Sequence, residues 1–284
     1  MCGIIGINSH KPVSSAIINS LKKLEYRGYD SAGIATLSSG SINEIKSEGR
    51  VDNLEKNLLV QKMEGTIGIG HVRWATHGIP SSLNAHPHSS QNVSVVHNGI
   101  IENSTILKKF LIKKGHKFKS QTDTEVIAHL IQFYMEKGKD LDSAVISTIA
   151  KLKGAYALGI LDKNNPDTLI GVRQQSPLVI GEGFEEQFIA SDIMALSNIT
   201  NKFKFMDDGQ IAILDKDKIA VTSSSGVAVK LKTQEVDSNA YTNDLKGYSH
   251  FMEKEIFEQS NVIKNSLEGR LAKNESQEGI FGVG

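Results

Sequence analysis

The sequence opens with Met1-Cys2-Gly3-Ile4-Ile5-Gly6-Ile7-Asn8, in which a cysteine stands directly before an apolar run. Residues 3–8 predict a short buried strand, because isoleucine is β-branched and favoured in strands. Cys2 is the sole cysteine of the chain. Removal of Met1, which a small following side chain permits, exposes Cys2 as a new N-terminus. We therefore expect a free N-terminal cysteine beside a core strand.

The remaining secondary structure is predicted in blocks. Helices are expected from Pro12 to Leu24, weakly between 38 and 66, and at about 102–114, 123–136, 140–151 and from Phe251 onward. Strands are expected at 32–38, 66–74 and 93–97, and repeatedly from 155 to 235. Residues 75–92 show no period and predict a lid or binding loop. Blocks without regular alternation favour an α+β fold of antiparallel sheets with helices outside.

Composition limits the class of partner. The chain has 284 residues, and its 32 Lys+Arg balance its 32 Asp+Glu. This balance disfavours nucleic acid or an anionic membrane as the main partner. No run approaches the roughly 18 apolar residues of a membrane span, and the N-terminus lacks the basic start of a signal peptide. A lone cysteine forms no internal disulfide, so a cytoplasmic protein is expected.

Cys2 is the first candidate for chemistry. A thiolate is a strong nucleophile, but free cysteine at neutral pH holds little of it and needs a base. The α-amine of an N-terminal Cys2 has an unperturbed pKa of about 7.7–8.0 and can accept the thiol proton. The alternative is that Cys2 is a small buried hydrophobe.

The tripeptide His97-Asn98-Gly99 follows an apolar strand. The Asn98 side-chain NH₂ and the Gly99 N–H are a suitable pair of donors for the oxyanion of an acyl-transfer intermediate. The alternative is a hairpin turn, for which Asn-Gly is the commonest signal.

Arg73, Trp74 and Asp123 are candidate substrate contacts. Arg73 offers a forked donor for a carboxylate, and Trp74 can form a pocket wall or lid; the alternative is a core Trp beside a surface Arg. Asp123 can bind an ammonium group, or it can stabilise the start of a helix, where Thr122 and Glu125 match a capping box. The spacings of the histidines match no metal site, so neither metal nor cofactor is expected.

Six segments form a joint pattern: Met1-Cys2-Gly3-Ile4-Ile5-Gly6, Leu24-Glu25-Tyr26-Arg27-Gly28-Tyr29-Asp30-Ser31-Ala32-Gly33, Arg73-Trp74-Ala75-Thr76-His77-Gly78, Asn84-Ala85-His86-Pro87-His88, His97-Asn98-Gly99-Ile100-Ile101-Glu102-Asn103 and Thr122-Asp123-Thr124-Glu125-Val126-Ile127-Ala128-His129. The pattern resembles the glutaminase (class II glutamine amidotransferase) domains of the glucosamine-6-phosphate synthase family, from Cys2 to about Asn265. That resemblance implies an N-terminal-nucleophile hydrolase, a four-layer αββα sandwich of two antiparallel sheets.

The resemblance also implies roles for individual residues. Cys2 is expected to form a γ-glutamyl thioester with its α-amine as base, Asn98 and Gly99 to form the oxyanion hole, and Arg27 to order the Cys2 terminus. The residues expected at the glutamine site are Arg73 for the α-carboxylate, Asp123 for the α-ammonium, Thr76, His77 and His86 for the glutamine loop, and Trp74 as gate for ammonia.

The same resemblance sets the expected domains and partners. Residues 1–240 are expected to form the glutaminase domain, and residues 241–284 a linker and the start of a sugar-phosphate isomerase region that stops early. L-Glutamine is the expected substrate, whereas fructose 6-phosphate is expected only at the missing isomerase region of a full-length homodimer. Two other hypotheses remain: an amidotransferase for another acceptor, such as a phosphoribosyl amine, and a non-catalytic glutamine-binding module, which would keep Met1.

Overall fold

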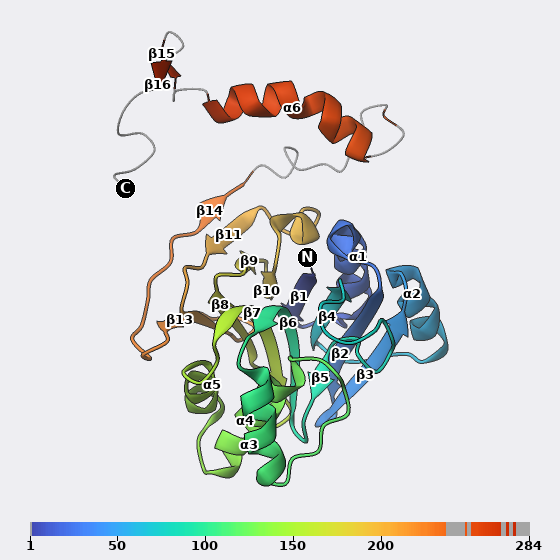
Figure 1. The fold of residues 1–284 in the computed structure, drawn as a ribbon, viewed down its shortest axis with the longest axis vertical. Helices are drawn as coiled ribbons and strands as arrows, with labels where there is room; N and C mark the ends of the chain where they lie inside the picture. The colour runs from blue at the N-terminus through green and yellow to red at the C-terminus, as the bar shows by residue number, and fades with distance from the viewer. Residues whose placement is uncertain (1, 237–247, 249–250, 268–270, 273–274, 277–284) are drawn as a thin grey trace. The chain divides into compact units, whose positions relative to one another are not determined.

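The computed structural model describes residues 2–236, 248, 251–267, 271–272 and 275–276. The chain divides into two compact units, residues 1–240 and 241–284. The first unit contains two antiparallel sheets (Figure 1). The second unit contains α6 (Phe251–Leu267) and the short strands β15 (Leu271–Ala272) and β16 (Glu275–Ser276). Within the described residues, no helix combines the length and apolarity that crossing a membrane requires.

The first sheet has eight strands. They are β1 (Gly3–Asn8), β2 (Ser31–Ser38), β3 (Ser41–Glu48), β4 (Ile67–Arg73), β9 (Val179–Glu182), β10 (Gln187–Ala190), β11 (Lys202–Phe205) and β14 (Gln234–Glu235). Their spatial order is β14-β11-β9-β10-β1-β4-β2-β3. The strand that follows Cys2 therefore lies in the middle of this sheet, between β10 and β4, where every residue of β1 is buried.

The second sheet has six strands. They are β5 (His88–Ser89), β6 (Val93–Ile101), β7 (Gly154–Asp162), β8 (Leu169–Gln174), β12 (Gln210–Leu214) and β13 (Ile219–Ser223), in the order β13-β12-β8-β7-β6-β5. The helices of this unit are α1 (Ser14–Leu24), α2 (Val51–Val60), α3 (Ser104–Lys113), α4 (Glu125–Glu136) and α5 (Leu141–Ile149), with two 3₁₀ turns, η1 (Glu25–Arg27) and η2 (Ile193–Leu196).

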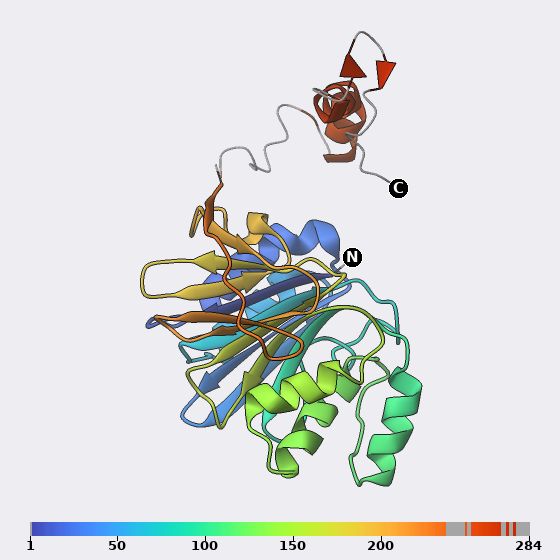
Figure 2. The same ribbon diagram turned by 90° about the vertical axis from the view of Figure 1, so that its left-hand side faces the viewer.

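The layers follow from the alternation of side chains along the strands. Ile5 and Ile7 of β1 pack on the side of α1 and α2, whereas Ile4 packs against the second sheet. The outer face of the second sheet is covered by α3, α4 and α5, as Figures 1 and 2 show. The order of layers is helices, sheet, sheet, helices, so the expected α+β arrangement of two antiparallel sheets is confirmed.

The structure differs from two local predictions and excludes one alternative. Strand β3 was not expected, because its sequence mixes polar and apolar residues. Asn98-Gly99 is no hairpin turn, since β6 continues to Ile101 and pairs with β7 through both residues. Helix α4 begins at Glu125, and the expected capping box is absent: the Glu125 carboxylate accepts hydrogen bonds from the backbone N–H groups of Lys119 and Ser120.

Candidate active site

Cys2 lies at the start of β1 and is only partly exposed. Its sulfur accepts a hydrogen bond from the Trp74 backbone N–H, with a distance of 3.2 Å between Sγ and N. Burial raises the pKa of the thiol above its ordinary value, although the Trp74 N–H and the charge of Arg73 act in the opposite direction. The thiol therefore needs a base before it can act as a nucleophile. This partial exposure disfavours the alternative interpretation of Cys2 as a small buried hydrophobe.

Asn98 reaches Cys2 from the second sheet. Its Nδ2 donates to the Cys2 carbonyl oxygen over 3.0 Å. Its Oδ1 lies 3.1 Å from Nε2 of His71, a buried residue of β4. The amide is thus held on both sides, with its NH₂ group directed at the backbone of Cys2. One N–H of that group remains for a further acceptor.

Gly99 follows in β6 with φ of +127°. A Cβ atom at this position would lie 2.0 Å from the carbonyl oxygen of Ala155 on β7. Glycine is required here, both for the backbone conformation and for the close approach of the two strands. The strand can continue past Asn98 for this reason.

Arg73 at the end of β4 is buried, with 3% of its surface exposed. Its guanidinium donates to the carbonyl oxygens of His77, Gly78 and Ile79. A guanidinium has five N–H groups, so donors remain for a further acceptor. Trp74 is 53% exposed and packs edge-on against Tyr29. The alternative of a core Trp beside a surface Arg is therefore wrong for both residues.

Asp123 lies before α4 and is buried. Its Oδ2 accepts a hydrogen bond from the Ile101 backbone N–H over 2.7 Å, which ties the residue to the end of β6. Its Oδ1 is 3.9 Å from Nδ1 of His77. Asp123 is not a helix cap, because Thr124 occupies the cap position.

Thr124 joins two buried imidazoles near this carboxylate. Its hydroxyl lies 2.8 Å from Nε2 of His86 and 2.9 Å from Nδ1 of His97. The His86 ring packs against that of His71 at a tilt of 33°, with 4.0 Å between ring centroids. Burial lowers the pKa of His86 well below its usual value and that of His71 to about 3. These rings are neutral at pH 7 and act through hydrogen bonds and packing.

An irregular segment was predicted at residues 75–92, and the structure has one at residues 74–87, between β4 and β5. Asn84 fixes this loop, since its Nδ2 donates to the Ile79 carbonyl oxygen and to Oε1 of Gln121, and its Oδ1 accepts from the Gln121 N–H. Gly33 of β2 allows the loop to approach the sheet, because a Cβ there would lie 2.0 Å from the His86 carbonyl oxygen. The loop thus contacts β2 of the first sheet and the segment before α4.

Arg27 does not line the pocket that contains Cys2. Its guanidinium forms an ion pair with Asp192, 2.6 Å between Nη2 and Oδ2, and donates to the Tyr26 hydroxyl. Gly28 beside it touches the backbone of Arg73 and Trp74, where a Cβ would lie 2.7 Å from the Arg73 carbonyl oxygen. Arg27 is therefore connected to Cys2 only indirectly. Gly28, which follows Arg27, touches the backbone of Trp74, and the Trp74 N–H donates to the Cys2 sulfur.

A single small pocket gathers most of the predicted site residues. They are Cys2, Arg73, Trp74, Thr76, His77, His86, Gly99 and Asp123. The pocket also contains His97, Thr122 and Thr124, which the sequence did not single out as site residues. Asn98 and Arg27 lie outside its lining. Its free volume is about 10 Å³, the space of one water molecule, so a ligand the size of an amino acid requires the loop to shift. No group of metal-binding side chains occurs among the described residues.

Comparison with known proteins identifies the type of domain. Residues 71–198 match the family model of the glutamine amidotransferase domain. The chain is 45% identical over 267 residues to a glutamine–fructose-6-phosphate aminotransferase (isomerizing) of Mesorhizobium japonicum, covering 94% of this chain and 44% of that protein. It is 46% identical over 277 residues to the corresponding enzyme of Francisella tularensis, covering 97% and 45%. The chain spans about half the length of the curated relatives it matches.

Solved structures share the fold. A glutamine phosphoribosylpyrophosphate amidotransferase from B. subtilis superposes with a TM-score of 0.69 at 27% identity, over 78% of this chain and 49% of that one. A second structure, described as the allosteric regulatory enzyme of purine biosynthesis, superposes with a TM-score of 0.70 at 29% identity, over 78% of this chain and 49% of that one. With the two antiparallel sheets between helical layers, these likenesses confirm the expected N-terminal-nucleophile hydrolase fold.

Proposed function

We propose, from the premise that the chain carries a glutamine amidotransferase domain, that it hydrolyses L-glutamine to glutamate and ammonia through a thioester on Cys2. The observation that supports this most strongly is the position of Cys2. Its sulfur lies at the wall of a pocket that also contains Arg73 and Asp123, and the Asn98 amide is fixed beside it.

In the first half of the reaction, the α-amine of Cys2, freed by loss of Met1, takes the proton of the thiol. The Cys2 sulfur then attacks the side-chain carbonyl carbon of glutamine, and a C–S bond forms. The Asn98 N–H and the Gly99 N–H stabilise the negative oxygen of the tetrahedral intermediate. The C–N bond breaks, and the amine returns the proton to the departing ammonia. The product on the enzyme is a γ-glutamyl thioester.

In the second half, a water molecule gives its proton to the α-amine and attacks the thioester carbonyl. The C–S bond breaks, the sulfur recovers a proton, and glutamate leaves. The raised pKa of the Cys2 thiol supports this scheme, since a thiol that holds its proton requires a base.

The α-carbon of glutamine carries two groups of opposite charge, a carboxylate and an ammonium. We assign its α-carboxylate to the remaining N–H groups of Arg73, which is buried and pairs with oxygens in a forked geometry. Its α-ammonium is assigned to Asp123, whose Oδ1 is not used by the Ile101 N–H. Thr76, His77 and His86 belong to the loop that closes over the substrate, and Trp74 borders the route by which ammonia leaves.

For the acceptor, the names of the most similar relatives favour fructose 6-phosphate and the formation of glucosamine 6-phosphate in a full-length cytoplasmic enzyme. Residues 241–284 are assigned to the linker and the start of the isomerase region. The phosphoribosyl alternative is disfavoured, because the solved amidotransferase of that type is only 27% identical.

The direct test is glutamate release from L-glutamine by the purified chain without any sugar phosphate. We expect steady turnover by the unaltered chain and none by Cys2→Ala, which keeps the pocket but lacks the sulfur. Equal glutamate release by both proteins would remove Cys2 from the mechanism.

A further inference from the structure

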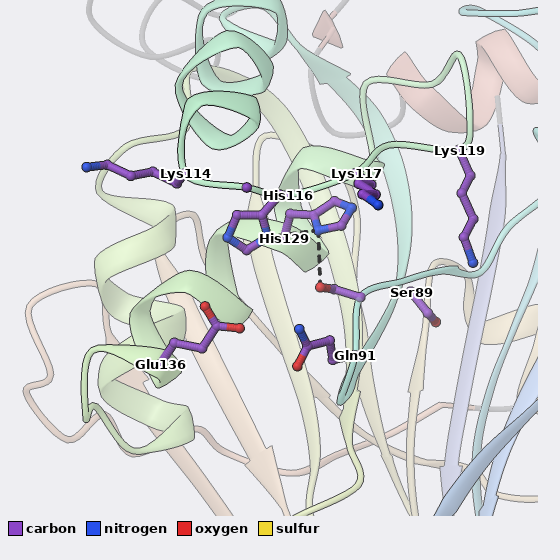
Figure 3. Close-up of a pocket in the computed structure, with 10 residues that line it drawn as sticks. Ser89, Gln91, Lys114, His116, Lys117, Lys119, His129 and Glu136 are labelled. Atoms are coloured by element: carbon purple, nitrogen blue, oxygen red, sulfur yellow. Dashed lines mark hydrogen bonds between the residues drawn. The ribbon is translucent and has the colours of Figure 1, made fainter.

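A second and larger cavity lies between the β5–β6 connection, the segment that follows α3, and α4 (Figure 3). Its volume is about 570 Å³, within the range of about 300–1,000 Å³ that small-molecule sites occupy. None of the residues that line it belongs to the pocket around Cys2. The proposed glutaminase reaction therefore gives this cavity no role.

Positive charge is concentrated at this cavity. Lys114, Lys117 and Lys119 line it, whereas Glu136 contributes the one carboxylate among the described residues of its lining. Over the whole chain basic and acidic residues are equal in number, so the excess is local. Figure 3 shows Lys117 and Lys119 on one side of His129 and Lys114 on the other side, beside His116. An anion placed between them is attracted from two directions.

The wall of the cavity also carries an ordered pair of imidazoles. Nδ1 of His116 lies 3.1 Å from Nδ1 of His129, which is itself 3.1 Å from the Ser90 hydroxyl oxygen. Nε2 of His129 faces the Glu125 carboxylate at 3.5 Å. The Nδ1 atoms of the two rings share one hydrogen bond, whose donor depends on the tautomers of the rings. The two imidazoles and the Ser90 hydroxyl thus hold this wall of the cavity together.

The lysine segment is fixed to α4 rather than loosely attached. The backbone N–H groups of Lys119 and Ser120 donate to the two carboxylate oxygens of Glu125 over 2.8 and 2.7 Å. Burial alone would raise the pKa of Glu125, but hydrogen bonds from His129, Lys119 and Ser120 lower it to about 2. Its negative charge is thus permanent and already satisfied by these donors. A site held in place before binding loses less entropy when the ligand arrives.

We propose that this cavity binds a small molecule that carries a phosphate group, with the ammonium groups of Lys117 and Lys119 around the phosphate oxygens. A phosphate monoester has a charge of about −1.5 to −2 at pH 7 and three acceptor oxygens, which suits several point-like ammonium charges. A carboxylate ligand would favour the fork of an arginine, and no arginine occurs among the described residues of the lining. The concave shape and the balanced charge of the chain favour a small molecule over a nucleic acid.

The test is calorimetric titration of the intact chain with inorganic phosphate, with glucose 6-phosphate, and with glucose at matched ionic strength. We expect saturable one-to-one binding of the phosphate compounds and none of glucose. Lys117→Ala/Lys119→Ala is expected to weaken binding about tenfold or more, equivalent to about 1.4 kcal/mol. The matched control is Lys109→Ala/Lys113→Ala, which removes two exposed lysines of α3 that do not line the cavity.

The outcomes are distinct. Tighter binding of glucose 6-phosphate than of phosphate identifies an organic phosphate as the ligand class, and equal binding identifies the free anion. If both double variants bind the phosphate compounds equally weakly, the attraction is a general effect of charge and the proposal is overturned. Binding that does not saturate would overturn it as well. A short oligonucleotide that binds more tightly than either phosphate compound would replace the small molecule with a nucleic acid. Thermal unfolding of each variant verifies that the fold is intact.

Discussion

His71 on β4 and Asn98 on β6 are joined across the two sheets, with 3.1 Å between Nε2 of the imidazole and Oδ1 of the amide. The same Nε2 lies 3.0 Å from the carbonyl oxygen of His97. Burial lowers the pKa of His71 to about 3, so the ring is neutral at pH 7. Both partners are acceptors, and the single ring proton must therefore be on Nε2. This bond directs the NH₂ group of Asn98 toward Cys2.

Asn98→Ala is expected to reduce kcat for glutamine hydrolysis about 10²–10³-fold, because removal of one oxyanion-hole donor costs that much in other acyl-transfer enzymes. KM should change much less, since the interaction forms mainly in the transition state. Steady-state kinetics of glutamate release measure both constants. An unchanged kcat would return Asn98 to a purely structural role in β6.

His71→Phe is expected to lower kcat about tenfold while KM stays close to that of the unaltered chain. The change removes the hydrogen bond that orients the Asn98 amide, worth about 0.5–1.5 kcal/mol. His71→Gln, which keeps a donor, should recover part of the loss. If His71 only fills the core, both variants should melt at a lower temperature and retain kcat when assayed below that temperature.

Asp123→Asn is expected to raise KM for glutamine with the fold intact. The Asn side chain keeps an oxygen that can accept from the Ile101 N–H, but it loses the negative charge that we assign to the α-ammonium. Glutamine titration of glutamate release gives KM, and thermal unfolding gives Tm. A lower Tm with an unchanged KM would mean that Asp123 only ties α4 to β6.

The buried histidines make the fold sensitive to acid. The pKa values of His71 and His88 are both lowered to about 3 by burial. A histidine with such a lowered pKa contributes full stability above its unfolded value of about 6.5 and loses it as the pH falls. At pH 5 each of these two histidines should lower the free energy of unfolding by about 2 kcal/mol relative to pH 7.5. Urea unfolding at the two pH values measures the difference, and equal stabilities would mean that neither pKa is lowered.

The sequence predicted most elements and most pocket residues, because both depend on local patterns. The β-branched run after Cys2 predicted β1, and helical spacing predicted α1 and α4 near their observed positions. The turn interpretation of Asn98-Gly99 was wrong, because a local signal does not reveal the approach of Gly99 to Ala155 on a neighbouring strand.

Long-range hydrogen bonds could not be predicted in the same way. Thr122 and Glu125 have the spacing of a capping box, but Glu125 is used by the backbone of Lys119 and Ser120. The contact between His71 and Asn98 spans 27 residues between two sheets, and nothing in the residue types specifies it. Arg27 was expected to order the Cys2 terminus, and the ion pair of its guanidinium with Asp192 was not predicted.

The central claim is that Cys2 carries the γ-glutamyl group during turnover. Mass spectrometry of the chain, quenched in acid during glutamine hydrolysis, tests it most directly. We predict a protein lighter by Met1, a fraction of which carries one γ-glutamyl group on the peptide that contains Cys2, with none in Cys2→Ala. Steady glutamate release by a chain that keeps Met1, or with the γ-glutamyl group on a different residue, would contradict the account.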